Sequence, residues 1–398
     1  MAELTTTAAV LFWTAFALAG YVYVGYPAIA WLRSRFFPRA VARGPIEPYV
    51  TVVVVAHNEG RRIGRRIENL LSSDYPRERL AIVIGSDGST DDTVEIARRY
   101  CSEGVAVREF AQRRGKAAVL NDLMASAHGD VVVFADARQR FEAGALRALV
   151  ANFADPRVGA VSGELHLTKR NGASSGGEGA GFYWKYETFI RASESWSGST
   201  VGATGAIYAI RRRLYTPIPV DTILDDVRIP MGIVRKGYRV VFEPGARAHD
   251  LIPTTPSEDF VRKTRTIAGT FQLFAREPWI LSPLRSTVWF QALSHKALRL
   301  AIPLLHAVML LSNAVVADVG LYGALLAGQV LFYAAAVAGY VQMRAGRRRS
   351  IVLTVPFTMC LLGWATIVGL GRFVARRQRV TWERMPGEPG PRVASRPV

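Results

Sequence analysis

Uncharged apolar segments lie at both ends of the chain, and a long middle part of mixed polarity separates them. Residues 7–32 contain no charged side chain, and about 20 apolar residues are enough to cross a bilayer. A signal peptide is the alternative, but only Glu3 stands where basic residues would be needed, and the apolar run is too long. Three further apolar segments lie at about 297–317, 319–341 and 351–371. The pattern predicts an integral membrane protein.

Charged residues beside these segments predict the orientation. Four arginines directly follow the first segment: Arg33, Arg35, Arg39 and Arg43. Because basic loops stay in the cytosol, this end and the polar middle should be cytosolic. The loop at 344–350 and the tail after 371 are also rich in arginine, whereas the turn at Asp318 has no base. Three crossings that start from the cytosol would put the tail outside, so either the rule fails or one segment does not cross.

The middle part, residues 46–275, alternates between continuous apolar runs and segments with helical spacing. The runs "YVTVVVVA", "LAIVIGSD" and "DVVVFADA" are typical of strands that are buried on both faces. Alternating strands and helices predict an α/β domain with a mostly parallel sheet. Before it lies an anchor with a basic linker (1–45), and after it an interfacial segment, about three membrane segments and a basic tail (276–398). A glycine-rich loop at 171–181 is either filler or a cover for a ligand.

The chain has 398 residues and a formal net charge of +18, which raises the question of nucleic-acid binding. Much of that charge flanks the apolar segments, where membrane orientation and anionic lipid explain it, and no zinc-ligand spacing accompanies it. We therefore expect no nucleic-acid partner. The two cysteines, Cys101 and Cys360, lie far apart in different kinds of segment. No disulfide is expected between them, which suits a cytosolic catalytic domain.

Polar side chains stand at the ends of the predicted strands. His57, Asp87 and Asp136 each follow an apolar run. Because ligands bind beyond the carboxyl ends of the strands in an open α/β sheet, these residues predict a ligand site. Asp136 could meet a metal ion there, but Arg138 stands where a second metal-binding acid would be expected.

Seven segments in order along the chain resemble motifs of the membrane-embedded family-2 glycosyltransferases, the relatives of cellulose, chitin, hyaluronan and poly-N-acetylglucosamine synthases. They are "VVVVAHNEG", "GSDGSTDDT", "GKAAVLN", "VVVFADA", "GATGAIYAIRR", "DDVRIPMGIVRKGYRVVFEPGA" and "RKTRTIAGTFQL". The resemblance covers residues 50–275 and extends to "SHKALRLAIP" before the second apolar segment. It implies a GT-A-type fold between transmembrane helices, a nucleotide-sugar donor that we expect to be UDP-linked, a divalent metal (Mg²⁺ or Mn²⁺) and inversion at the anomeric carbon.

The resemblance implies roles for individual residues. Asp226, the second acid of "LDD", stands where the family has its catalytic base. Asp87 resembles the acid that binds the uridine, and Lys116 resembles a lysine near the nucleotide. Asp136 is the first acid of the metal-binding Asp-x-Asp motif. Arg265 resembles an arginine that lies near the donor diphosphate and the acceptor.

His57, Glu59 and Arg138 are expected on the donor side of the same site. Arg138 replaces the second metal acid, but one carboxylate with two diphosphate oxygens and waters can still hold Mg²⁺. We therefore interpret the metal site as different from the family's and not as broken. Arg138 would either contact the diphosphate directly or turn toward solvent.

The chain departs from the family in two further places. His249 is either a third metal ligand or an ordinary surface residue at a strand end. Arg262 and Thr266 stand where the family has the Gln and Trp that flank the arginine. Because that Trp packs near the acceptor sugar in the polymerising relatives, its replacement puts processive synthesis in doubt.

The sequence therefore predicts an integral inner-membrane enzyme that transfers a sugar to a glycan or lipid-linked acceptor at the cytosolic face, in cell-surface polysaccharide synthesis. Two alternatives remain open. A sugar-phosphate nucleotidyltransferase has a related fold, but its glycine-rich start with a pyrophosphate-binding lysine is missing after the first strand. A non-enzymatic transport or scaffold subunit would explain the membrane segments but not Asp87, Asp136 and Asp226 together.

Overall fold

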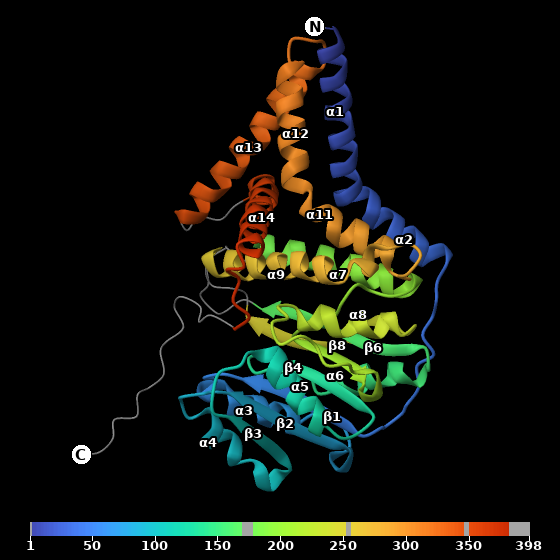
Figure 1. Ribbon diagram of the computed structural model, residues 1–398, viewed down its shortest axis with the longest axis vertical. Helices are drawn as coiled ribbons and strands as arrows, with labels where there is room; N and C mark the ends of the chain where they lie inside the picture. The colour runs from blue at the N-terminus through green and yellow to red at the C-terminus, as the bar shows by residue number, and fades with distance from the viewer. Residues whose placement is uncertain (1, 169–177, 252–255, 346–349, 382–398) are drawn as a thin grey trace, which may run out of the picture.

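The computed structural model describes residues 2–168, 178–251, 256–345 and 350–381. Most of the glycine-rich loop at 171–181, and part of the basic loop at 344–350, lie outside these residues. The described chain forms a sheet domain, a layer of two long helices above it, and a group of apolar helices that rises from this layer (Figure 1).

The sheet has eight strands in the order β3-β2-β1-β4-β7-β6-β8-β5. Their bounds are β1 (Val50–Ala56), β2 (Leu80–Asp87), β3 (Val105–Phe110), β4 (Val131–Asp136), β5 (Arg140–Phe141), β6 (Val158–Thr168), β7 (Ile207–Arg211) and β8 (Arg239–Leu251). Within the described residues, four of the seven strand pairings are parallel, including all three among β1, β2, β3 and β4. This confirms the predicted α/β class with a mostly parallel sheet. β7 runs antiparallel to both neighbours and divides the sheet into two halves.

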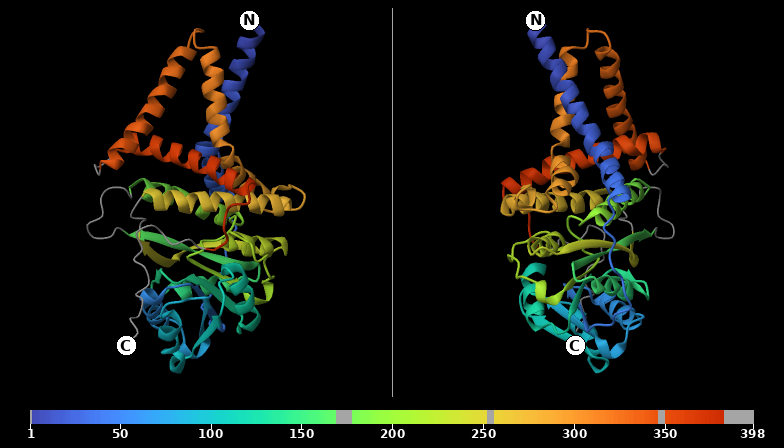
Figure 2. Two further views of the ribbon diagram at one scale, coloured as in Figure 1. Left: turned by 60° about the vertical axis from the view of Figure 1, so that its left-hand side comes forward. Right: turned by 90° about the vertical axis from the view of Figure 1, so that its right-hand side faces the viewer.

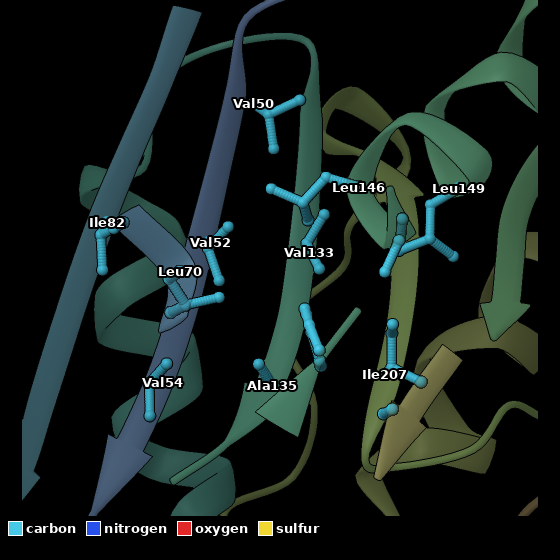
Figure 3. Close-up of a cluster of buried hydrophobic side chains, with 14 of the residues drawn as sticks. Val50, Val52, Val54, Leu70, Ile82, Val133, Ala135, Leu146, Leu149 and Ile207 are labelled. Atoms are coloured by element: carbon cyan, nitrogen blue, oxygen red, sulfur yellow. The ribbon is translucent and has the colours of Figure 1, made fainter. Parts of the chain in front are cut away.

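Helices cover both faces of the sheet. One face carries α3 (Gly60–Leu71), α4 (Thr93–Arg98) and α6 (Ala145–Ala151), and the other carries α5 (Lys116–Ser126) and α8 (Asp225–Arg235). Because side chains alternate along a strand, Val52 and Val54 pack toward α3 while Val53 packs toward α5. Both faces of β1 are therefore apolar, which explains its uninterrupted run of valines. Figure 3 shows Val52, Val54 and Leu70 of the first of these two clusters.

Three apolar helices rise steeply from the domain. The first runs without a break from Glu3 to Phe36 and comprises α1 (Ala2–Gly20), a π-helical turn (Tyr21–Gly25) and α2 (Tyr26–Phe36). The others are α12 (Ile302–Val315) and α13 (Tyr322–Arg344). α12 is bent by 56° from the preceding helical segment Trp289–Leu300, which contains α10 (Trp289–Gln291) and α11 (Leu298–Leu300). Pro303 in the first turn of α12 lacks the N–H that would continue the earlier helix.

The last apolar helix, α14 (Ile351–Val374), is long and apolar enough to span a bilayer, but its direction differs from that of the three upright helices. Figure 2 shows it running across the foot of the upright helices, above α9 (Pro256–Arg276). Gly369 permits this close packing, because a Cβ at that position would lie 2.8 Å from Ile267 Cγ2. The rings of Phe271 and Phe373 stack with centroids 6.1 Å apart. α9 and α7 (Glu178–Ser197) form the layer between the sheet domain and the apolar helices (Figure 1).

Candidate active site

A cluster of charged side chains lies where β4 ends and where α5 and α8 begin. Lys116 is the first residue of α5, and its Nζ lies 3.0 Å from Asp136 Oδ1 at the end of β4. The same Nζ lies 3.2 Å from Oδ2 of Asp225, the first residue of α8. Acids are favoured at a helix N-terminus, so α8 positions Asp225 at little cost. The lysine therefore connects two carboxylates that are 89 positions apart in the sequence.

These three groups stabilise one another as ions. Burial opposes ionisation of Asp136, but Lys116 and Arg138 outweigh it and lower the pKa of this carboxyl group. Burial likewise acts against the charge on Lys116, yet Asp136, Asp225 and Asp226 raise the pKa of its ammonium group. The cluster therefore holds a permanent positive charge between two acids at neutral pH.

Asp226 differs from its neighbour Asp225 in contacts and in charge. It lies against Gly205, where a Cβ would come within 2.8 Å of Asp226 Oδ2, so the chain approaches the carboxylate without a side chain. Burial and the charge of Asp225 raise the pKa of Asp226 to about 6, although Lys116 acts in the opposite direction. A carboxylate with a pKa near the working pH can accept a proton and release it again, as a general base must.

Asp87, at the end of β2, binds the loop that carries Lys116. Its Oδ1 accepts a hydrogen bond from the Arg114 N–H at 2.6 Å, and its Oδ2 accepts one from the Gly115 N–H at 2.9 Å. Gly115 has a φ of +92°, which a side chain would strain. The backbone oxygen of Asp87 lies 2.7 Å from His57 Nδ1. Asp87 and His57 thus join the ends of β1 and β2 to the start of α5.

Glu59 lies at the N-terminus of α3, the helix that follows β1. Its carboxylate accepts a hydrogen bond from Arg62 Nη1 at 3.1 Å, and its backbone N–H donates to Thr93 Oγ1 at 2.8 Å. These contacts fix the loop after β1 against the start of α4.

Arg138 is held by an acid from β8. Its Nε donates to Asp250 Oδ2 at 3.0 Å, and Gln139 Nε2 donates to the same oxygen at 2.9 Å. Arg138 lies close enough to Asp136 to lower the pKa of that carboxyl group. Its side chain therefore lies partly buried between Asp136 and Asp250, and does not turn fully toward solvent.

Arg265 lies in α9 and connects the cluster to the end of the chain. Its Nη2 donates a hydrogen bond to the Val380 carbonyl oxygen at 3.1 Å. Burial lowers the pKa of Arg265, and the carboxylates of Asp225 and Asp226 act against this effect. A Cβ at Gly115 would lie 3.5 Å from Val380 Cγ1. The segment after α14 thus passes beside both Arg265 and the loop that carries Lys116.

Sequence reasoning missed four participants in this site. The sequence analysis gives Asp225 no role beside Asp226, Asp250 follows a strand without a motif, and Val380 lies in a tail whose composition indicates only that it is basic. The fourth is Arg66, which is 2% exposed and whose guanidinium lies 4.0 Å from the ring centroid of Phe141. Burial lowers the pKa of Arg66 to about 9, and Asp136 acts against this effect. The available signal was the repeated Asp in "LDD"; the other three depend on long-range packing.

The residues fit a divalent metal only in part. Within the described residues, no group of three or more His, Cys, Asp or Glu side chains could hold a metal ion. His249 Nε2 lies 2.9 Å from Glu142 Oε1, and its ring lies 5.5 Å from that of His166. Asp136 remains as an oxygen ligand, and it would share its charge with Lys116. One carboxylate suits Mg²⁺ or Mn²⁺ when donor oxygens and waters complete the coordination.

Comparison with known proteins agrees with this arrangement. Residues 51–216 match the model of the family "Glycosyl transferase family 2". A poly-beta-1,6-N-acetyl-D-glucosamine synthase of Staphylococcus aureus is 26% identical over 234 residues, which are 57% of this chain and 56% of the relative. A beta-monoglucosyldiacylglycerol synthase of Synechocystis is 35% identical over 118 residues, which are 29% of this chain and 25% of the relative. The chain thus spans about half the length, or less, of these curated relatives.

A solved structure matches almost the whole chain. It is a mannosyltransferase from Pyrobaculum calidifontis in complex with GDP-Man and Mn²⁺, with a TM-score of 0.70 and 25% sequence identity. The match covers 92% of this chain and 99% of that one, so it includes membrane-proximal helices as well as the sheet. Residues 51–216 thus match the family-2 glycosyltransferases, within a sheet domain of GT-A-type fold, and the chain is similar to the poly-N-acetylglucosamine synthases and to this mannosyltransferase.

Proposed function

We propose that this protein transfers a sugar from a nucleotide-sugar donor to an acceptor at the membrane surface, with inversion at the anomeric carbon. The observation that carries the proposal is the carboxylate of Asp226, with its pKa raised to about 6, beside the ionised cluster of Lys116, Asp136 and Asp225. The site lies at the carboxyl ends of parallel strands, where open α/β sheets bind their ligands.

Asp226 acts as the general base. An acceptor hydroxyl is a poor nucleophile, and its proton must leave as its oxygen attacks the anomeric carbon. Asp226 takes that proton while the bond between the anomeric carbon and the diphosphate oxygen breaks. The electron pair of that bond leaves with the nucleoside diphosphate. A carboxylate in hydrogen-bond reach contributes roughly 10²–10⁴-fold to such a step.

The cations of the site stabilise the leaving diphosphate. Lys116 and Arg265 both lie near the acidic cluster, and Arg138 lies beside Asp136. Charge-assisted hydrogen bonds from such groups are shorter and stronger than neutral ones. Asp136 would hold a Mg²⁺ or Mn²⁺ ion together with oxygens of the donor, and such an ion would supply Lewis-acid stabilisation of the leaving diphosphate. Asp87 and His57 hold the loop of Lys116 in place, and Glu59 holds the neighbouring turn.

The direction of α14 supports an orientation with the catalytic domain in the cytosol. The start of α1, which contains Glu3, and the turn between α12 and α13, which contains Asp318, lie at the far ends of the upright helices (Figure 1). The end of α2, with Arg33 and Arg35, and the segment after it lie toward the sheet domain. The crossings would then be α1, the bent pair of Trp289–Leu300 and α12, and α13, with α14 along the surface, and the described part of the basic tail returns to the domain side. The basic segments among the described residues then satisfy the positive-inside rule, and the catalytic domain is cytosolic.

Donor hydrolysis by the purified protein tests the proposal. A panel of UDP- and GDP-linked sugars is incubated with the protein in detergent, and release of free nucleoside diphosphate is measured with Mg²⁺ or Mn²⁺. We expect one donor to be turned over, and Asp226→Asn to stop its transfer to any acceptor. No turnover of any nucleotide sugar, with sugar 1-phosphates and nucleoside triphosphates converted instead, would favour a nucleotidyltransferase. No turnover of either kind would favour a non-enzymatic role.

A further inference from the structure

A cavity of about 640 Å³ lies between the apolar helices and the helical layer above the sheet. Residues from α9, from the segment around α11 and α12, from α14 and from the turn after α1 line it. Most of the lining is apolar, with Ile267, Ile302, Val355, Met359 and Leu362 among its members. Its size and lining match the usual range for pockets that bury a small molecule, about 300–1,000 Å³ and mostly apolar.

Cations line one side of this cavity. Lys296 and Arg299 belong to the lining, whereas Glu187, which pairs with both, lies outside it. Lys296 Nζ and Arg299 Nη1 each lie 2.7 Å from a carboxylate oxygen of Glu187. Burial opposes ionisation of Glu187, but His295, Lys296 and Arg299 lower its pKa well below the usual range. The cavity is therefore apolar on one side and positively charged on the other.

Two helices connect the cavity to the candidate base. In α9, Thr266 and Ile267 line the cavity, while the adjacent Arg265 faces Asp225 and Asp226. The cavity and the acidic cluster thus lie on two sides of one helix.

The second connection runs through α7. Arg191 lies one turn after Glu187, and its Nη2 donates to Ser162 Oγ at 2.7 Å. Its Nη1 donates to Thr204, the residue before the glycine that touches Asp226. The charged side of the cavity and the base are therefore linked through a single buried arginine.

We propose that this cavity binds the acceptor and that the acceptor is an anionic membrane lipid. This inference rests on the proposed glycosyl transfer and names its acceptor class. The apolar chain lies against α14 and α12, the negatively charged head group lies at Lys296 and Arg299, and the lipid hydroxyl points past α9 to Asp226. A growing polysaccharide fits this lining less well, because most of the lining surface is apolar and its polar side chains could replace only part of the hydrogen bonds that sugar hydroxyls make to water.

The test compares two matched glycine variants of α14. A Cβ at Gly363 would lie 3.9 Å from Pro303 Cγ, its nearest neighbour, so Gly363→Trp should fill the cavity. A Cβ at Gly371 meets nothing within 4 Å, and this exposed residue does not line the cavity, so Gly371→Trp is the control. Both proteins are reconstituted in vesicles of phosphatidylglycerol, an anionic lipid with free hydroxyl groups, and in phosphatidylcholine vesicles that contain diacylglycerol as an uncharged acceptor. Equal labelling of the two lipids would show that the head group need not be anionic. A labelled donor is added, and the label is measured in the organic extract and in water-soluble polymer.

We expect wild type and Gly371→Trp to place the label in the organic extract. In Gly363→Trp the label in the organic extract should be at least tenfold lower than in wild type. Its rate of donor hydrolysis without acceptor should stay within twofold of the wild-type rate. Lys296→Gln gives an independent test, because it should raise the KM for the anionic lipid and leave donor hydrolysis unchanged. A photoactivatable phosphatidylglycerol should also crosslink to α14 in wild type and not in Gly363→Trp.

Three results would overturn the inference. Label in water-soluble polymer, unaffected by Gly363→Trp, would show that the acceptor is a glycan while the proposed function stands. Equal lipid labelling by both glycine variants together with an unchanged KM in Lys296→Gln would place the lipid elsewhere. Absence of donor turnover in wild type would remove the proposed function itself, and the acceptor with it.

Discussion

Lys116 Nζ lies 3.0 Å from Asp136 Oδ1, so a fixed cation stands beside the carboxylate that the sequence assigns to a metal. The second acid of the expected metal pair is replaced by Arg138, and the second carboxylate near the ammonium comes from Asp225 instead. Part of the positive charge that a metal ion would otherwise supply thus comes from protein side chains. This predicts weak binding of a free metal ion and strong coupling between metal and donor.

Replacement of Lys116 by methionine should tighten Mn²⁺ binding in the absence of nucleotide. Asp136 and Asp225 would lose the ammonium between them and present their charge to the ion. We expect about a tenfold change, which corresponds to ~1.4 kcal/mol. In wild type, UDP should strengthen metal binding, and metal should strengthen UDP binding by the same factor. Calorimetric titrations with Mn²⁺, with and without UDP, measure both effects.

Arg114→Met is the matched control for this charge change. Arg114 lies two positions before Lys116 but pairs with Asp122 at 2.6 Å, away from the cluster. Its replacement should leave metal affinity unchanged. Tight binding of Mn²⁺ to wild type without UDP, unaffected by Asp136→Ala, would show that the metal binds elsewhere.

Asp226→Asn should abolish transfer while UDP affinity stays within a few-fold of wild type. The amide has the shape of the acid but cannot accept the acceptor proton, so a loss of roughly 10²–10⁴-fold is expected. Since the pKa of Asp226 is raised to about 6, kcat/KM of wild type should fall as the pH decreases through 6. A pH profile of initial rates measures this limb. Wild-type turnover in Asp226→Asn, or a flat profile between pH 5 and 7, would remove Asp226 from the mechanism.

The same substitution should stabilise the fold at neutral pH. A raised pKa means that ionised Asp226 is disfavoured in the folded state, and this cost develops as the pH rises from 3.8 toward about 6. Asparagine removes the cost above that range. Because one pKa unit corresponds to ~1.4 kcal/mol and Asp226 is partly exposed, we expect a gain of ~1–2 kcal/mol at pH 7. The gain should vanish at pH 4.

Thermal unfolding at pH 4 and pH 7 tests this prediction, with Asp225→Asn as the control. Asp225 pairs with Lys116 at 3.2 Å, so its replacement leaves that ammonium with one partner fewer and should lower stability. Equal effects of the two substitutions at pH 7 would contradict the different environments of the two acids.

The sequence predicts the fold correctly where the hydrophobic pattern allows only one kind of element. The continuous runs of β1, β2 and β4 specify buried parallel strands, and these strands place His57, Asp87 and Asp136 at one edge. The reversal at β7 and the parallel pairing of β6 with β8 depend on contacts between distant segments, which the local pattern does not contain. For this reason Asp250 could not be placed beside Arg138 from the sequence.

The adjacent acids Asp225 and Asp226 at the start of α8 show that the sequence is equally limited within the site. Neighbouring residues in a helix point about 100° apart. One acid therefore faces Lys116 and the other faces Gly205. The sequence identifies the helix start and the family motif, but the different environments appear only when α5 and the segment before β7 are in place.

Hydropathy alone also leaves the path of α14 open. An apolar helix of this length can cross a bilayer or lie at its surface, and the packing of α14 against α9 favours the surface path. We predict that Asp318→Cys and Arg377→Cys, each in a background without Cys101 and Cys360, differ in access from outside the cell. A membrane-impermeant maleimide should label position 318 in intact cells and position 377 only after permeabilisation. The exposed native Cys101 marks the catalytic domain and should behave like position 377. Labelling of position 377 from outside would mean that α14 crosses the membrane.

Substitutions of Arg138 test whether this cation binds the donor or only stabilises the structure. Arg138→Asp restores the two-acid spacing with Asp136 and should tighten Mn²⁺ binding without UDP. It should nevertheless slow transfer, because the charge beside the leaving diphosphate changes sign. Arg138→Met removes the cation without adding an acid, so it should slow transfer about tenfold and tighten Mn²⁺ binding less than Arg138→Asp does.

Both Arg138 variants also release Asp250, whose side chain is only 9% exposed. Asp250→Asn therefore controls for the loss of this ion pair, because the amide can still pack beside Gln139. If Asp250→Asn slowed transfer as much as Arg138→Met, the arginine would act by holding β8 in place. If Asp250→Asn kept normal transfer while Arg138→Met did not, the guanidinium itself would act on the donor. Metal titrations and initial rates are measured on wild type, Arg138→Asp, Arg138→Met and Asp250→Asn. They separate these cases, because the rate depends on the charge at position 138 only if the guanidinium acts directly on the diphosphate.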